Sequence, residues 1–259
     1  MTHLLTHGQL KSMAAEGVLV LSPHFDDGCF SLGGMLTTWR AGVLVNVFNR
    51  SIHIPNTDAG SHVITSESQV AQVRDQEDQI FADRCAMGRC QLEGAEPGLL
   101  GRRPNDLSGL PHDIEAMTIT VLEKLQQLRG SHGKRPWLMT PMAIGRHVNH
   151  HAVHQIIWQH REFLRSAFRL GFYEDLPYAH DPVARIHAIK RFRSQWGRGM
   201  IRQAWPITWA KKLELVMIYA SQHKRTPSVM KYRPAAIWPM VCHEAFWCAP
   251  DELEIEFND

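Results

Sequence analysis

The residues best suited to chemistry in this sequence follow an apolar run near its start. Residues 17–21 predict a buried strand, and His24, Asp26 and Asp27 come shortly after it. In an open parallel sheet, ligands bind where the strands end, because the loops that leave the strands are exposed there. His24 and Asp27 can reach one metal ion, and Asp26 would lie beside that ion without having to bind it. Asp26 therefore suits a general base acting on a metal-bound water.

A second polar cluster follows a second apolar run. Residues 137–141 predict another buried strand, and His147 and His150 come shortly after it. Residues 151–158 then have the apolar spacing of a helix, which places His150 near a helix start with its ring free to face the edge of the sheet. Both clusters therefore follow strands and could converge on one metal ion.

The order of these motifs resembles that of the LmbE/PIG-L family of zinc-dependent N-deacetylases. Residues 24–27 (His-Phe-Asp-Asp) and 147–150 (His-Val-Asn-His) are similar to the paired motifs of the family, and residues 74–78 (Arg-Asp-Gln-Glu-Asp) to its Arg-x-x-Glu helix. Further segments recur in similar order in a subgroup that trims sugar-bearing natural products and lipids, namely 172–178, 219–222 and 244–247. The resemblance covers most of the chain.

Matched residue by residue, the resemblance implies a set of zinc ligands: His24, Asp27 and His150. It also implies that Asp26 is the catalytic base and that His147 steadies the oxyanion. Arg74 would contact the sugar of the substrate.

Three positions depart from the family's pattern. Gly28 replaces a Glu that often follows the two aspartates, and Gly145 replaces a Tyr that some members place two residues before the first His of the second motif. If that Tyr assists the oxyanion elsewhere, His147 acts alone here or another group substitutes for it. Asn149 replaces a common Asp, and an amide can still orient a neighbouring His by hydrogen bonding.

Two histidines and one carboxylate are typical ligands of a catalytic zinc, which keeps one position open. The bound water would have a pKa of about 7, and Asp26 would accept its proton as it attacks an amide carbonyl. Zinc and a protonated His147 would then stabilise the oxyanion. The sequence does not choose between Asp26 and His147 as the proton donor to the leaving amine, or between zinc, iron and cobalt, since these ligands accept all three metals.

The implied function is a zinc-dependent hydrolase that removes the acetyl group from an N-acetyl amino sugar, such as an N-acetylglucosaminyl glycoside or conjugate in antibiotic biosynthesis. One alternative is a hydrolase of another small acyl amide or ester, because only the pocket would differ. Another is a zinc-containing carbohydrate- or partner-binding protein that has lost catalysis. Gly28 and Gly145 keep that alternative open, whereas Asp26 argues against it, since a structural metal site has no use for an adjacent unligated base.

Each motif alone also has an ordinary structural explanation. A His-x-x-Asp segment is common in capped turns, and the chain has 16 histidines, which weakens the signal of any pair. Arg74 and Glu77 have the spacing of an exposed helical pair. The hypothesis of one site therefore depends on both clusters following buried-looking strands.

Composition favours an intracellular enzyme. The 259 residues, 44% of them hydrophobic, suffice for a single α/β domain over residues 1–259. A net charge of +2 does not predict a nucleic-acid partner. The chain has neither a signal-peptide pattern nor an apolar run of the roughly 18 residues of a membrane span, so we expect a cytoplasmic protein without a transmembrane segment. Five cysteines without a Cys-x-x-Cys pair predict reduced thiols, and a homo-oligomer stays open.

Residues 185–212 combine basic residues with tryptophans. This pattern fits an anionic or glycan substrate, a membrane-surface patch or an oligomer interface. It also fits a solvated helix whose tryptophans pack inward.

Strand and helix patterns alternate along the chain. Strands are predicted at 17–22, 43–48, 90–92, 137–140 and 170–174, and helices near 30–41, 66–87, 111–128 and 149–168. This alternation predicts a Rossmann-like, doubly wound, mostly parallel sheet flanked by helices. Beyond residue 180 the pattern predicts a helix at 207–223 and a terminal strand within 237–247. The long loops 51–64 and 93–111 each follow a strand and are predicted to border the pocket.

Overall fold

The computed structural model describes residues 2–55, 66–130, 135–223, 227–235 and 242–253. Within these residues, eight strands form one sheet in the order β1-β7-β8-β6-β5-β2-β3-β4. The five strands that the sequence predicted before residue 180 are all present: β2 (Val18–Ser22), β3 (Val43–Asn46), β4 (Gly88–Gln91), β5 (Trp137–Pro141) and β6 (Arg169–Tyr173). They run parallel to one another, which confirms the predicted fold class.

The remaining strands extend the sheet on one side. β8 (His243–Cys248) pairs antiparallel with both β6 and β7 (Ile201–Pro206), and β1 (Thr2–Leu4) pairs with the outer side of β7. The predicted terminal strand within 237–247 is therefore present as β8, although 237–241 lie outside the described residues. The strand β7 was not predicted, because its Arg202 is a charged residue that is buried through an ion pair with Glu174.

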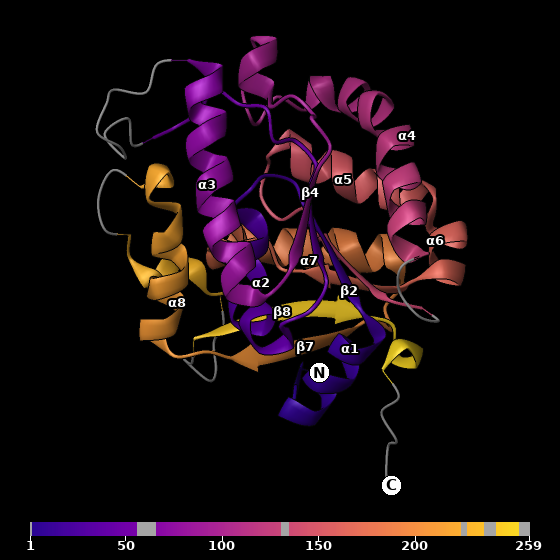
Figure 1. Ribbon diagram of the computed structural model, residues 1–259. Coiled ribbons are helices and arrows are strands. Elements are labelled where there is room, and N and C mark those ends of the chain that lie inside the picture. Colours follow the sequence, from indigo (N-terminus) through magenta and orange to yellow (C-terminus); the bar gives the residue numbers. More distant parts are fainter. Residues whose placement is uncertain (1, 56–65, 131–134, 224–226, 236–241, 254–259) are drawn as a thin grey trace, which may run out of the picture.

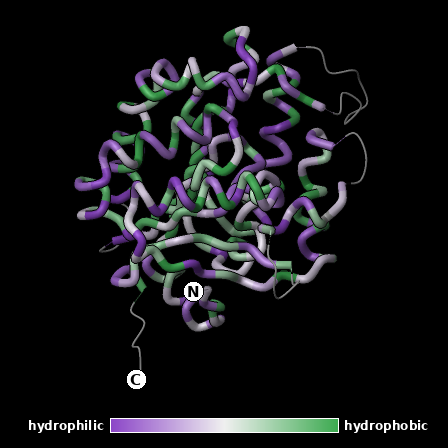
Figure 2. The backbone as a smooth tube through the Cα atoms, turned by 180° about the vertical axis from the view of Figure 1, so that it is seen from behind, coloured by the Kyte–Doolittle hydropathy of each residue, from purple (hydrophilic) through white to green (hydrophobic). Residues whose placement is uncertain are grey.

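Helices cover both faces of the sheet. They are α1 (His7–Glu16), α2 (Asp27–Trp39), α3 (Glu67–Cys85), α4 (Leu110–Arg129), α5 (Val148–Gln159), α6 (Arg161–Ala167), α7 (Pro182–Trp196) and α8 (Trp209–Val216). Figure 1 shows α3 and α8 on one side of the central strands and α4 and α6 on the other. Figure 2, which shows the molecule from behind, places many of the hydrophobic residues along the segments that run through its middle.

Two helical predictions need correction, and one helix was not predicted. The helix predicted at 149–168 is two helices, α5 and α6, because His160 between them has a non-helical backbone (φ −108°, ψ 18°). The one predicted at 207–223 is α8 followed by a 3₁₀ segment, Met217–Gln222, that is broken at Tyr219. The sequence analysis did not predict α1, which is only 10 residues long.

The basic segment 185–212 is not one surface feature. It contains most of α7, all of β7 and the start of α8. Trp196 packs inward, with its ring 4.3 Å from that of Phe172, as the helix interpretation expected. Arg185 and Arg202 both bind Glu174, so these two cations neutralise a buried carboxylate instead of facing a partner.

The order of the strands reverses between β2 and β5. From β2 the chain continues to β3 and β4 on one side, then crosses back to β5 and β6 on the other. Such a switch point opens a crevice at the carboxyl ends of the two central strands, where ligands bind in sheets of this kind. The two polar clusters of the sequence follow β2 and β5, so the topology brings both to this crevice.

A fully buried ion pair fixes α2 against α8 and β8. Lys212 Nζ donates to Glu244 Oε1 at 2.7 Å and to the carbonyl oxygen of Phe30 at 2.6 Å, and both charged side chains have 0% exposure. Glu244 also accepts the backbone N–H groups of Gly34 (2.8 Å) and Met35 (2.9 Å). The pair therefore holds the helix that begins at the first polar cluster.

We expect Lys212→Met to lower the free energy of unfolding by about 3–5 kcal/mol, because it leaves the Glu244 carboxylate buried without its counter-charge. The measurement is urea unfolding of the full chain. Lys211→Met is the matched control, since the Lys211 side chain is 36% exposed and we expect a change of at most about 1 kcal/mol. Equal effects of the two substitutions would contradict a structural role for the buried pair.

Candidate metal centre

The ends of β2 and β5 bring the three predicted metal ligands together. Asp27 Oδ2 lies 3.0 Å from His24 Nδ1 and 3.2 Å from His150 Nε2. All three side chains are buried. Residues more than 120 positions apart in the sequence therefore meet at one carboxylate oxygen.

Local structure after β2 presents these side chains to the crevice. The Ser22 hydroxyl donates to the His24 carbonyl oxygen and accepts from the Gly28 N–H, which closes the loop into α2. Asp26 stands at the N-cap of α2 but makes no side-chain capping bond, so its carboxylate is free to face the pocket. His147 is the N-cap of α5, which places His150 in the first turn of that helix.

Hydrogen bonds on the far side of each imidazole select the nitrogen that faces the crevice. His150 Nδ1 contacts Asp175 Oδ1 at 2.7 Å, and Asp175 Oδ2 accepts the Ile144 N–H at 2.9 Å. His24 Nε2 contacts Asn149 Oδ1 at 3.1 Å, so Asn149 does hydrogen-bond a neighbouring His as expected. His24 Nδ1 and His150 Nε2 are left to face Asp27.

The donor set fits a divalent cation. His150 Nε2 is buried, and although Asp27 Oδ2 lies 3.2 Å away, this nitrogen makes no well-oriented hydrogen bond among the described residues. Burial alone would lower the pKa of His150, but Asp27 and Asp175 outweigh burial and raise this pKa to about 10. The pKa of His24 is also raised, because Glu96 and Asp27 outweigh burial. The surroundings thus favour positive charge where the three ligand atoms meet, and a metal ion would supply it in place of protons.

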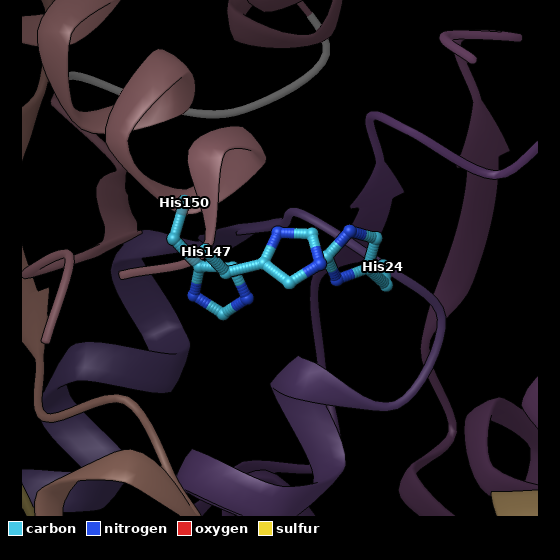
Figure 3. A group of neighbouring side chains, drawn as sticks. All are labelled: His24, His147 and His150. Carbon is cyan, nitrogen blue, oxygen red and sulfur yellow. The ribbon is translucent and has the colours of Figure 1, made fainter. Parts of the chain in front are cut away.

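His147 lies beside this group. Its ring centroid is 4.5 Å from that of His24 and 5.4 Å from that of His150, and Figure 3 shows the three rings gathered together. One ligand atom from each of the three histidines lies within 4.8 Å of the others, so His147 is a geometric alternative to Asp27 as third ligand. Burial lowers the pKa of His147, and His24 and His150 lower it further. The structure therefore favours neutral His147, contrary to the protonated form expected from the sequence.

Arg74 holds two carboxylates of the pocket, those of Asp26 and Glu96. Arg74 Nη2 lies 3.4 Å from Asp26 Oδ1, and Arg74 Nη1 donates to Glu96 Oε1 at 2.6 Å. Burial and the neighbouring Asp27 raise the pKa of Asp26 to about 6, although Arg74 lowers it. Arg74 is only 3% exposed, so its main contacts in the structure are these two carboxylates.

The interpretation of Arg74 and Glu77 as an exposed helical pair is wrong. Glu77 is buried and accepts hydrogen bonds from the Ser221 N–H (2.7 Å) and hydroxyl (2.6 Å). On the next residue of α3, Asp78 accepts from the Tyr219 hydroxyl at 3.0 Å. The segment 219–222, which the sequence analysis singled out, thus packs on α3 beside the pocket.

A cavity of about 600 Å³ opens above this group of side chains. Its polar lining includes His24, Asp26, Asp27, Arg74, Glu96 and His147, and rings from Phe30, Tyr178, His223 and Tyr232 also line it. Both loops predicted to border the pocket contribute, with Ile52, His53 and Pro55 from the first and Pro97, Gly98 and Pro104 from the second. Residues 56–64 of the first loop lie outside the described residues.

The two glycines that depart from the family's pattern have different surroundings. A Cβ on Gly28 would face the Ser22 hydroxyl at 3.4 Å and Leu44 Cδ2 at 3.5 Å, so this position points at the sheet and not into the cavity. Gly145 has φ +85°, and a Cβ there would lie 2.9 Å from the ring of Tyr178. Tyr178 therefore fills the space beside Gly145 and forms part of the cavity wall.

Fold and site together define an α/β protein with a candidate metal centre at the switch point of its sheet. No protein-family model matches the chain. It is 28% identical over 181 residues to the 2'-N-acetylparomamine deacetylase of Streptomyces fradiae, and the match covers 62% of this chain and 57% of that protein. The matched region is thus less than two thirds of the relative's length.

Two solved structures share the fold. The antimicrobial reagent A40926 pseudoaglycone deacetylase Dbv21 has a TM-score of 0.60 and 18% identity, and the alignment covers 90% of this chain and 97% of that one. The zinc-inhibited form of teicoplanin deacetylase Orf2 has a TM-score of 0.55 and 16% identity, with coverage of 89% and 96%. The fold is therefore that of known deacetylases, which agrees with the resemblance of the motifs to the LmbE/PIG-L family.

Two further properties bear on where such a protein could act. Among the helices of the described residues, none has the length and apolar character needed to span a membrane. All five cysteines are free thiols, as expected from their number and spacing.

Proposed function

We propose that this protein is a zinc-dependent hydrolase that removes the acetyl group from the nitrogen of an N-acetyl amino sugar. The observation that carries the proposal is that His24 Nδ1 and His150 Nε2 both lie within 3.2 Å of Asp27 Oδ2, with the Asp26 carboxylate beside them at the cavity. Asp26 is also close enough to His24 and Asp27 to share an ion with them, but two histidines and Asp27 already supply three ligands, which leaves Asp26 for another role. Similarity to the 2'-N-acetylparomamine, A40926 pseudoaglycone and teicoplanin deacetylases supports it.

In this proposal His24, Asp27 and His150 hold the metal. Zinc, when bound, would acidify a water molecule and polarise the acyl carbonyl. Asp26 accepts the proton of the attacking water, because Arg74 holds its carboxylate at the cavity. His147 donates a hydrogen bond from its neutral ring to the oxygen that becomes negative as the carbonyl is attacked. Since His147 is not the protonated group, Asp26 passes its proton to the departing nitrogen.

The cavity also indicates the size of the substrate. Its volume of about 600 Å³ is within the range of roughly 300–1,000 Å³ that is usual for small-molecule sites, and has room for a sugar and part of an aglycone. Arg74, which lines the cavity, would contact the sugar while it holds Asp26. We therefore propose a small-molecule amino-sugar conjugate of an antibiotic pathway as substrate.

Two broader proposals accompany this one. We propose that residues 1–259 form a single domain, because all strands of the described residues belong to one sheet. We also propose that the protein works in the cytoplasm, where its five free cysteines would stay reduced.

Mass spectrometry of a substrate panel tests the function. We expect zinc-loaded protein to remove one acetyl mass from N-acetylglucosaminides that carry aromatic, lipid or sugar aglycones, and to leave the matching O-acetyl compounds intact. Turnover of esters or of unrelated acyl amides alone would favour the broader hydrolase. Zinc binding without turnover of any compound would favour a binding protein that has lost catalysis.

A further inference from the structure

We propose that Asp113 and Asn149 are positioning residues that determine which nitrogen of His24 carries a proton and which one faces the metal. The inference rests on the proposed metal centre and goes beyond it, because neither residue would touch metal or substrate. It concerns a chain of hydrogen bonds that starts behind His24 and ends in the loop at the mouth of the cavity.

The chain of contacts crosses from α5 to α4. His24 Nε2 lies 3.1 Å from Asn149 Oδ1, and Asn149 Nδ2 donates to Asp113 Oδ2 at 3.2 Å. Asn149 is 0% exposed and Asp113 is 1% exposed, so water does not compete for these bonds. Asn149 Oδ1 therefore has His24 as its partner, and Asn149 Nδ2 has Asp113.

The order of donors and acceptors fixes the state of His24. An amide alone could turn either end towards an imidazole, because it carries both a donor and an acceptor. A carboxylate only accepts, so Asp113 holds the NH₂ group of Asn149 and turns the amide oxygen towards His24. That oxygen needs a donor, which places a proton on His24 Nε2. His24 Nδ1 is then the nitrogen with a free lone pair, and it is the one that faces Asp27.

Asp113 is itself held in place by charge. Arg102 Nη2 donates to Asp113 Oδ1, the oxygen that does not contact Asn149, and His112 Nδ1 lies 3.3 Å from the same oxygen. A Cβ on Gly109 would overlap Arg102 Nη1, so a glycine is required for the guanidinium to lie across the start of α4. The ion pair thus leaves Asp113 Oδ2 turned towards Asn149.

Arg102 also connects the chain of contacts to the cavity. It belongs to the loop 93–111, of which Pro97, Gly98 and Pro104 line the cavity. A metal ligand and the loop expected to contact the substrate therefore share one hydrogen-bonded path. Mutation of residues that hydrogen-bond a metal ligand in this way typically lowers metal affinity by about 10- to 100-fold.

Exchanging the carboxylate of Asp113 and the amide of Asn149 tests the proposal. The zinc affinity of each variant is measured by competition with a chelator. In Asp113→Asn the Asn149 amide loses its acceptor-only partner and can turn its NH₂ group to His24, which would move the proton to Nδ1. We expect zinc affinity to fall by about 10- to 100-fold. Adding Asn149→Asp should restore it, because the carboxylate introduced by this second substitution accepts from His24 Nε2–H and from the amide introduced by the first.

The double variant separates positioning from a merely structural role. Asp113→Asn and Asp113→Asn/Asn149→Asp both lose the negative charge that pairs with Arg102. If Asp113 only joins Arg102 to α4, both variants should therefore bind zinc equally weakly. That result, or unchanged affinity in Asp113→Asn, would overturn the inference. Absence of zinc from the wild-type protein would overturn the proposed metal centre, and the inference with it.

A measurement without substitutions covers the case in which the single variant does not fold. Nitrogen NMR of the zinc-loaded full chain reports the protonation of each imidazole nitrogen. We expect His24 to be bound to zinc through Nδ1 and protonated on Nε2. Coordination through Nε2 would contradict the proposal, whatever the stability of the variants.

Discussion

Alanine at His24, Asp27 or His150 is expected to remove nearly all zinc from the purified protein. The wild type should hold roughly one zinc ion per chain. His24 Nδ1 and His150 Nε2 lie 3.0 and 3.2 Å from Asp27 Oδ2, so loss of any one of these three side chains leaves two donors. A catalytic zinc normally needs three protein ligands. Elemental analysis after gel filtration measures the effect directly.

His147→Ala is the matched control for the ligand variants. His147 is the N-cap of the helix that carries His150, and its ring lies 4.5 Å from that of His24 and 5.4 Å from that of His150, yet the proposal gives it no metal bond. We therefore expect His147→Ala to keep its zinc. If His147→Ala loses the metal while Asp27→Ala keeps it, the ligands are the three histidines and the assignment of Asp27 is wrong.

The sequence predicted the meeting of the two clusters because of a simple rule. Apolar runs predict buried parallel strands, and the carboxyl ends of parallel strands share one edge. His24 and Asp27 follow β2, and His150 follows β5, so the order of the strands was enough to bring them together. The same rule could have identified Asp175, which comes just after β6 and contacts His150.

Other residues of the site could not be found by this rule. Asp113 lies in the first turn of α4 and Glu96 in an irregular loop, and no spacing relates either one to His24. Their roles depend on how α4 packs against α5 and on how the loop 93–111 folds back over the sheet, which are tertiary facts. The lowered pKa of His147 could not be predicted for a similar reason, because it depends on burial and on His24, a neighbour distant in sequence.

Buried charged residues also show where apolar periodicity fails, in the strand β7 that was not predicted and in the helix α8 that was. In β7, Arg202 breaks the apolar pattern of a strand. It is tolerated because its Nε donates a hydrogen bond to Glu174 Oε1 at 2.7 Å. In α8, Lys212 is tolerated for the same reason, through Glu244. Periodicity assigns such residues to the surface, whereas ion pairs formed across the fold allow them inside.

Asp26→Asn is expected to keep zinc and to lower the turnover number by about 10²- to 10⁴-fold, the usual contribution of a general base. The amide has nearly the shape of the carboxylate but cannot take a proton from water. The three proposed ligands His24, Asp27 and His150 remain in this variant, so metal binding should survive. Loss of zinc would instead make Asp26 a ligand, since it lies close enough to His24 and Asp27 to share an ion with them. Metal content and rate are measured on one sample, with KM and kcat determined separately, because loss of a base should appear in kcat.

Glu96→Gln distinguishes the base from the charges around it. Glu96 and Asp26 both contact Arg74, at 2.6 and 3.4 Å, so each substitution removes one negative charge beside the same guanidinium. If Asp26 acts as the base, Glu96→Gln should reduce the rate far less than Asp26→Asn does, because the proton acceptor remains. Equal losses in both variants would mean that Asp26 matters only as a partner of Arg74. Near-normal turnover by zinc-loaded Asp26→Asn would mean that another group accepts the proton, and the imidazole of His147, which also lines the cavity, is one alternative.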